Sequence, residues 1–201
     1  MRTNAMTKLT TKTNCVGTGE FYAARDQRTR VARTTASNEA YHRSVNPPAL
    51  GRRGEGWVVL QSIVIVAAVA CAVIGPSWPN DSESWLRVIG FVLEAAGAGI
   101  LIVSRITLGR SFTPMPRPRD RSTLRITGIY ASARHPIYGG LLVLLLGLSF
   151  HRSPLVLAPT ALLAGIFWLK SIREEAWLAE RYPEYDAYRR ATPRRFIPGI
   201  V

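Results

Sequence analysis

The sequence predicts an all-α protein, a polytopic membrane bundle of about four transmembrane helices with a C-terminal interfacial amphipathic helix. The 201-residue chain is 47% hydrophobic and only 19% charged, and its apolar residues gather into four runs. An α-helix needs about 20 apolar residues to cross a bilayer core, which is close to the length of the longer runs. The 26 Lys and Arg residues concentrate in alternate connecting segments, as in membrane proteins with a fixed orientation.

The first 55 residues carry no apolar run. They are rich in Thr, Arg, Asn and Ser, and such a segment cannot bury enough apolar surface to offset the entropy lost on ordering. No apolar stretch follows the early basic residues, so a signal peptide is not indicated. We expect 1–55 to be a disordered basic cytoplasmic tail that contacts anionic membrane lipid. A specific nucleic-acid or partner role is the alternative.

The first two spans of the remaining domain, residues 56–201, are predicted at 57–75 and 85–104. The first span has a tryptophan near each end, as interfacial anchors do. The second contains Glu94, and a carboxylate inside a span is costly unless it is neutral or paired. We expect a structural carboxylate there, with a functional role as the alternative. The small residues that follow, as far as Gly99, would let a neighbouring helix approach closely.

A basic segment at 105–133, broken by three prolines, separates these spans from two more, predicted at 130–150 and 154–170. The connection between the last two is so short that they must run antiparallel. The start of the third and the end of the fourth then lie at the same membrane face. Residues 171–201 leave the bilayer, and their aromatic spacing predicts an amphipathic helix that Pro183 breaks or restarts.

The basic residues also predict the orientation. Ten Lys and Arg precede Trp57, seven lie between Arg105 and Arg134, and seven run from Lys170 to Arg195. The other two connections contribute one arginine each. Because cytoplasmic loops carry the excess of Lys and Arg, we expect an integral protein of the cytoplasmic or plasma membrane with both termini in the cytoplasm.

Several function classes are disfavoured. A net charge of +13 would suggest nucleic-acid binding in a soluble protein, but here the basic residues alternate with membrane spans, so no nucleic-acid partner is expected. The two cysteines and three histidines show no disulfide framework and no ligand spacing, so no metal site is expected. The sequence contains neither a dinucleotide-binding glycine fingerprint nor a P-loop.

Chemistry-bearing residues gather at the boundary shared by the last two spans. The candidates are Arg134, His135, Tyr138, Arg173, Glu174, Glu175, Tyr185 and Tyr188. Aromatic faces and carboxylates stabilise a sulfonium, and arginine can hold a carboxylate, so a bipolar cofactor with a cationic centre suits such a pocket. Taken singly, each residue also has a structural explanation. Arg134 can be a membrane anchor, and Glu174 can pair with Lys170 one turn away.

These residues form a pattern that resembles the isoprenylcysteine carboxyl methyltransferase and phospholipid N-methyltransferase superfamily. The resemblance covers roughly the C-terminal half. It rests on Leu108–Phe112, Gly128-x-Tyr130, Arg134-His135-Pro136-x-Tyr138-x-Gly140, Glu174-Glu175, Tyr182-Pro183-Glu184-Tyr185-x-x-Tyr188 and Arg195–Pro198.

The resemblance implies a membrane methyltransferase that uses S-adenosylmethionine on a lipophilic or lipidated acceptor, most like isoprenylcysteine carboxyl O-methyltransferase. By this analogy the catalytic residues are Arg134, Glu175 and Arg173. The cofactor-binding residues are His135, Tyr138, Gly140, Glu174, Tyr185 and Tyr188.

Two questions stay open at this point: the kind of acceptor and the class of protein. A carboxylate acceptor needs only an arginine to hold it, whereas an amine acceptor must lose a proton, which Glu175 could take. The alternatives to a methyltransferase are an NADPH-dependent membrane sterol or lipid reductase with a similar C-terminal hairpin and a non-catalytic membrane protein.

Overall fold

A computed structural model describes residues 47–79, 83–117 and 123–197, and the regular structure within these ranges is entirely helical. Most of the predicted tail, residues 1–46, lies outside them. The longer helices are α2 (Glu55–Ile74), α3 (Glu83–Leu108), α4 (Pro136–His151), α5 (Leu157–Arg181) and α6 (Tyr185–Ala191). Short 3₁₀ turns are η1 (Gly109–Ser111), η2 (Gly128–Ala131) and η3 (Pro154–Val156). The predicted all-α membrane bundle is confirmed.

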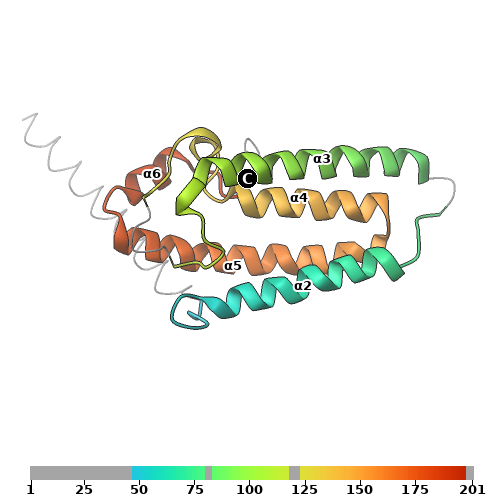
Figure 1. Ribbon diagram of the computed structural model, residues 1–201, viewed down its shortest axis with the longest axis horizontal. Helices are drawn as coiled ribbons and strands as arrows, with labels where there is room; N and C mark the ends of the chain where they lie inside the picture. The colour runs from blue at the N-terminus through green and yellow to red at the C-terminus, as the bar shows by residue number, and fades with distance from the viewer. Residues whose placement is uncertain (1–46, 80–82, 118–122, 198–201) are drawn as a thin grey trace, which may run out of the picture. The chain divides into compact units, whose positions relative to one another are not determined.

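The four long helices pack as two pairs (Figure 1). Helix α4 packs mainly against α3, and α5 packs mainly against α2. The chain turns from α4 into α5 through a few residues and η3, so these two helices run antiparallel as predicted. The principal neighbour of α4 is nevertheless α3. The start of α4 and the end of α5 lie at the same end of the bundle.

Glycines set the close approach of α3 and α4. A Cβ atom added to Gly97 would lie 2.5 Å from the backbone nitrogen of Leu144. A Cβ atom on Gly147 would lie 2.6 Å from the backbone oxygen of Gly90, so neither position has room for a side chain. Such backbone contact between small residues is a common way for helices to associate in membranes. The prediction of a close approach holds at Gly97, whereas Gly99 faces open space.

Three helical segments are long and apolar enough to cross a membrane by length and composition: 55–74, 84–111 and 154–181. Helix α4, with 16 residues, is shorter than an ordinary span and begins at Pro136, later than the predicted start at 130. Proline suits the first helical turn because its missing N–H would have no partner there. Residues 128–131 instead form η2.

The C-terminal part also differs from the predicted boundaries. Helix α5 continues without a break past the predicted exit at Lys170 and ends at Arg181. Pro183 then lies between α5 and α6, in agreement with the predicted break. The predicted amphipathic helix is therefore divided into the last turns of α5 and the seven-residue α6. This extension carries polar residues of α5 to the end of the bundle.

Glu94 is paired, as expected of a structural carboxylate. Its Oε1 atom lies 3.1 Å from Nδ1 of His151 at the end of α4. The ring of Phe91 lies against the same imidazole, with the ring centres 4.0 Å apart. The pair links α3 to α4 at the end of α4 that lies away from His135.

Candidate active site

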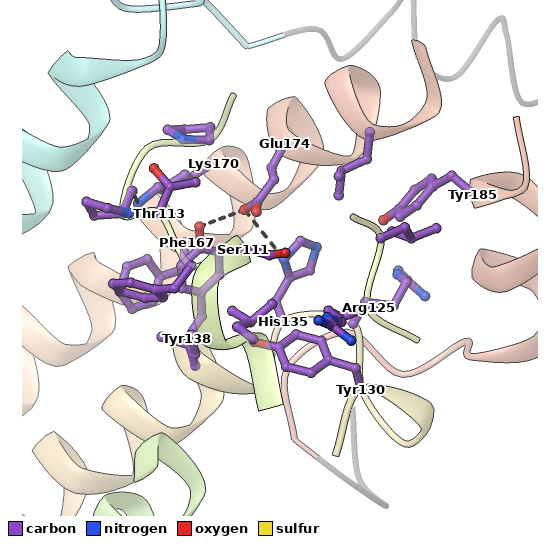
Figure 2. Close-up of a pocket in the computed structure, with 18 of the residues that line it drawn as sticks. Ser111, Thr113, Arg125, Tyr130, His135, Tyr138, Phe167, Lys170, Glu174 and Tyr185 are labelled. Atoms are coloured by element: carbon purple, nitrogen blue, oxygen red, sulfur yellow. Dashed lines mark hydrogen bonds and ion pairs between the residues drawn. The ribbon is translucent and has the colours of Figure 1, made fainter. Parts of the chain in front are cut away.

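A cavity of about 190 Å³ opens at the end of the bundle where α4 begins and α5 ends. Parts of α2, η1 and its following loop, residues 123–125, η2, α4, α5 and α6 line it. Its polar and aromatic wall includes Ser111, Arg125, Tyr130, Arg134, His135, Tyr138, Lys170, Glu174, Tyr182, Tyr185 and Tyr188. Ten of the lining residues are labelled in Figure 2. Elements far apart in the sequence thus contribute to one site.

The segment after α6 fixes the residues that precede α4. The backbone nitrogen of His135 donates to the carbonyl of Arg195 at 2.7 Å, and that of Arg134 donates to the carbonyl of Arg194 at 3.1 Å. A side chain on Gly139 would collide with the backbone oxygen of Phe196, so only glycine lets this segment lie against α4. The two sequence patterns at 134–140 and 195–198 therefore belong to one structural unit.

Glu175 lies behind the cavity wall and is surrounded by cations. Its Oε1 atom accepts hydrogen bonds from Nε of Arg134 and interacts with Nε2 of His135, each at 3.0 Å. Nε of Arg195 lies 3.6 Å from the same oxygen, and the residue is only 2% exposed. Arg134 also donates to the carbonyls of Thr192 and Pro193, which ties the start of α4 to the C-terminal segment. Glu175 thus holds Arg134 and His135 in place.

Glu174 is the carboxylate that lines the cavity. The hydroxyl of Tyr138 donates to its Oε2 atom at 2.7 Å, and Nδ1 of His135 lies 3.6 Å from that atom (Figure 2). The imidazole is therefore held between two consecutive carboxylates of α5. Its ring is also parallel to that of Tyr138, which in turn stacks on Phe167 with ring centres 4.5 Å apart. This wall combines a carboxylate with a series of aromatic faces.

The tyrosines of α6 differ in their partners. The hydroxyl of Tyr188 donates to the carbonyl of Tyr130 at 2.6 Å. The hydroxyl of Tyr185 has no hydrogen-bond partner among the described residues, although the side chain is 1% exposed and lines the cavity. Buried polar groups are normally hydrogen-bonded, so this phenol is a candidate for binding a ligand.

Burial keeps both phenols of α6 protonated. It raises the pKa of Tyr188 to about 12, an effect that the nearby Arg134 partly opposes. It also raises the pKa of Tyr185, and the negative charge of Glu175 adds to this shift. Both hydroxyls are therefore hydrogen-bond donors at neutral pH.

Three predicted site residues, Arg173, Gly140 and Glu175, do not line the cavity. The guanidinium of Arg173 stacks on Trp177, with its central carbon 4.6 Å from the ring centre. Arg195, rather than Arg173, is the further arginine near Glu175. Gly140 lies in the α3–α4 contact, where a Cβ atom would approach Ile100 to 2.9 Å. The other predicted residues of the cluster gather around the cavity as expected, with Glu175 behind it.

Lys170 also lines the cavity, although its sequence context suggested only a pair with Glu174. It is 1% exposed and lines the cavity with Gln61 of α2. Its ammonium donates to the side-chain oxygen of Gln61 and, at 3.0 Å, to the carbonyl of Pro114. Lys170 stands at the end of an apolar run, and an ionisable residue in such a place is itself a signal of function that the sequence shows.

The described residues contain no group of three or more His, Cys, Asp and Glu side chains that could hold a metal ion. The chemistry of the cavity is instead that of arginines, a lysine, tyrosines, one imidazole and one half-buried carboxylate. Such a set suits an organic ligand that carries both signs of charge.

Comparison with known families matches residues 85–185 to the model of the phospholipid methyltransferase family. The chain belongs to this family. It is therefore a member of the integral-membrane methyltransferases, as the resemblance implied. The matched range takes in most of the described cavity but omits α2, which supplies Gln61.

The individual relatives are named either as metal-resistance proteins or as probable methyltransferases. The chain is 32% identical over 147 residues to the nickel-cobalt-cadmium resistance protein NccN of Alcaligenes xylosoxydans, a match that covers 72% of this chain and 63% of that protein. It is 37% identical over 142 residues to the cobalt-zinc-cadmium resistance protein CzcN of Cupriavidus metallidurans, covering 69% and 62%.

A probable protein-S-isoprenylcysteine O-methyltransferase of rice (Oryza sativa subsp. japonica) is 30% identical over 117 residues, covering 55% of this chain and 61% of the rice protein. The chain thus spans less than two thirds of the length of each of these relatives.

Proposed function

We propose that this membrane methyltransferase uses S-adenosylmethionine to methylate a lipophilic acceptor, in the manner of an isoprenylcysteine carboxyl O-methyltransferase. The observation that carries the proposal is the buried hydroxyl of Tyr185, which lines the cavity and has no partner among the described residues. A ligand with hydrogen-bond acceptors would satisfy it. When bound, S-adenosylmethionine supplies a methyl group on a positively charged sulfur.

The residues of the cavity fit such a cofactor. The ring of Tyr130 and the carboxylate of Glu174 would favour its cationic centre. Arg125 and the hydroxyl of Tyr185 would favour its carboxylate and hydroxyl groups. The cavity thus offers both kinds of contact that a zwitterionic cofactor requires.

A carboxylate acceptor is favoured over an amine. An amine must give up a proton, and Glu175, the base expected to take it, already interacts with Arg134 and His135 behind the cavity wall. A carboxylate needs no base, because its own lone pair forms the new oxygen–carbon bond while the electrons of the sulfur–carbon bond leave with sulfur. Positioning and exclusion of water then supply most of the rate enhancement. The name of the rice relative supports the same choice.

We also propose that the cavity end of the bundle faces the cytoplasm, together with both termini. The three segments rich in Lys and Arg all lead to or from this end, whereas the opposite connections carry one arginine each. This is the distribution of the positive-inside rule. It would place the cavity on the side where a soluble cofactor is available.

Binding of S-adenosylhomocysteine, the demethylated cofactor, to the detergent-purified full chain tests the proposal. We expect micromolar binding, weakened about tenfold in Tyr185→Phe because one hydrogen bond to the ligand is lost. His135→Ala should also weaken binding, and His151→Ala is its matched control at the other end of α4. Tight NADPH binding in place of S-adenosylhomocysteine would favour the membrane reductase instead.

Metal tolerance is a second candidate role, favoured by the names of two relatives. We propose that any such role of this chain acts through methylation of a membrane component. Expression in a metal-sensitive host would test it. Tolerance should rise with the wild-type chain and not with Glu174→Gln, whereas equal tolerance with both would separate the role from the cavity.

A further inference from the structure

Lys170 is a buried cation at the end of the apolar run of α5. Helix α5 extends eleven residues beyond it to Arg181, which corresponds to about 16 Å at 1.5 Å per residue. The side chain is 1% exposed, and its ammonium lies 5.1 Å from the ring centre of Tyr138. Taking a charge out of water is costly, so a lysine as buried as this one calls for a compensating partner.

The protein supplies only neutral partners at bonding distance. The ammonium donates to the side-chain oxygen of Gln61 and to the carbonyl of Pro114, and an ammonium has three N–H donors. Within the described ranges no carboxylate lies within 4.0 Å of it. Glu174, one turn along α5, instead accepts from Tyr138. Among the described residues the buried charge therefore has no carboxylate at ion-pair distance, and Glu174 attracts it only from farther away.

The cavity that Lys170 lines also has apolar side chains in its wall. Ile137, Leu141 and Phe167 line the cavity along with it. Lys170 and Tyr185 lie on opposite sides of Glu174 in Figure 2, so the cavity has two distinct ends. One end presents the phenol of Tyr185, and the other presents the ammonium of Lys170 beside the ring of Tyr138.

We propose that Lys170 selects an acceptor with an acidic oxygen on an apolar chain, and that Gln61 and Pro114 hold its ammonium toward that oxygen. This inference rests on the proposed methyltransferase function. The acidic oxygen would provide the missing counter-charge, and an amine at the same place would add a second cation to a water-poor site. Helix α2, outside the matched family range, thereby takes part in the choice of acceptor.

Palmitate and hexadecylamine are suitable probes, because they have the same chain length and opposite charges. Their binding to the full chain in detergent would be measured with and without S-adenosylhomocysteine. We expect the wild type to bind palmitate at least about tenfold more tightly than hexadecylamine. Lys170→Met should abolish this preference and leave the affinity for S-adenosylhomocysteine unchanged. Lys170→Arg should keep the preference because it keeps the charge.

Arg152→Met, which removes one positive charge in the connection at the opposite end, is the matched control and should bind like the wild type. Thermal unfolding would establish that each variant is folded, and Lys170→Gln would repeat the test if the methionine variant is not. An unchanged preference in folded Lys170→Met or Lys170→Gln would overturn the proposal.

Equal loss of palmitate and S-adenosylhomocysteine binding would also overturn it, because the lysine would then serve the cofactor. Failure of the wild type to bind S-adenosylhomocysteine would count against the methyltransferase function alone. The preference between the two lipids can be read without the cofactor, so the two failures are distinguishable.

Discussion

Both ends of α4 carry a histidine paired with a glutamate, and the two pairs differ in what surrounds them. His151 meets Glu94 of α3 at 3.1 Å, and both side chains are about a fifth to a quarter exposed. His135 lies between Glu174 and Glu175, with Arg134 on the second carboxylate, and its side chain is 5% exposed. The first pair connects two helices, whereas the second belongs to a buried network beside a cavity. The buried network and the cavity beside it, rather than the histidine–glutamate pair itself, distinguish the end of α4 that carries the candidate site.

Replacing Glu175 should have the largest effect. Glu175→Ala leaves Arg134 and His135 without their shared acceptor in a site that is 2% exposed at the carboxylate. Loss of one partner from a buried charge network destabilises a protein by about 3–5 kcal/mol. We expect a large fall in thermal stability in detergent together with loss of S-adenosylhomocysteine binding. A variant as stable as the wild type would contradict the positioning role.

Gly139→Ala should have the next largest effect. The new methyl group would collide with the backbone oxygen of Phe196, which cannot rotate away as a flexible side chain can. Overpacking of this kind costs about 1–3 kcal/mol. It should also weaken cofactor binding, because the displaced segment holds the backbone of Arg134 and His135.

The matched control for Gly139→Ala is Gly99→Ala, at a helical glycine with open space around it. It should be neutral or slightly stabilising, since alanine favours the helix. Similar stability losses in the two variants would mean that helix propensity, and not the contact with Phe196, governs this position.

The sequence predicted the fold class, the helical directions and most of the cluster, because apolar runs, basic segments and short connections follow local rules. The predicted helix boundaries were wrong where contacts with segments distant in the sequence determine where a helix begins. The helix of α4 begins only at Pro136 because Arg194 and Arg195, about 60 residues later, bind the backbone before it. Arg173 and Glu175 were assigned to the site by analogy with the family. A helix presents successive residues in different directions, so of the three consecutive residues Arg173, Glu174 and Glu175 only Glu174 lines the cavity.

Residue types alone also cannot show a long-range partner. Gly140 belongs to a motif, yet its lack of a side chain serves the contact with α3. The ammonium of Lys170 is positioned by Gln61, which lies more than 100 residues away in the sequence. Only the packed bundle brings these pairs together.

Tyr188→Phe tests the tyrosine side of the network, with an effect of about 1 kcal/mol from the lost hydrogen bond to the carbonyl of Tyr130. The pH dependence of the folding stability gives a second measure of the role of Tyr188. The pKa of Tyr188 is raised from 10.0 to about 12 in the folded chain. Between these values the unfolded chain has lost the phenolic proton and the folded chain retains it, so stability falls as pH rises from 10 to 12.

The phenylalanine variant should lose part of this alkaline decline, measured by thermal unfolding as a function of pH. Tyr185→Phe, whose hydroxyl has no described partner, should keep neutral-pH stability and lose ligand affinity. A loss of neutral-pH stability in Tyr185→Phe as large as that in Tyr188→Phe would show that the Tyr185 hydroxyl has a structural partner.

The smallest effect should come from Glu94→Gln at the far end of α4. Glutamine keeps the size of the side chain and one hydrogen-bonding oxygen for His151, and partly exposed ion pairs contribute about 0–1 kcal/mol. Thermal stability should therefore fall by a degree or so at most, and S-adenosylhomocysteine affinity should not change. The same substitution at Glu175 removes a charge that Arg134 and Arg195 both face, so it should affect both quantities. If Glu94→Gln weakened cofactor binding as Glu175→Gln does, the two histidine–glutamate pairs would be coupled along α4, and the distinction between a structural and a functional end would fail.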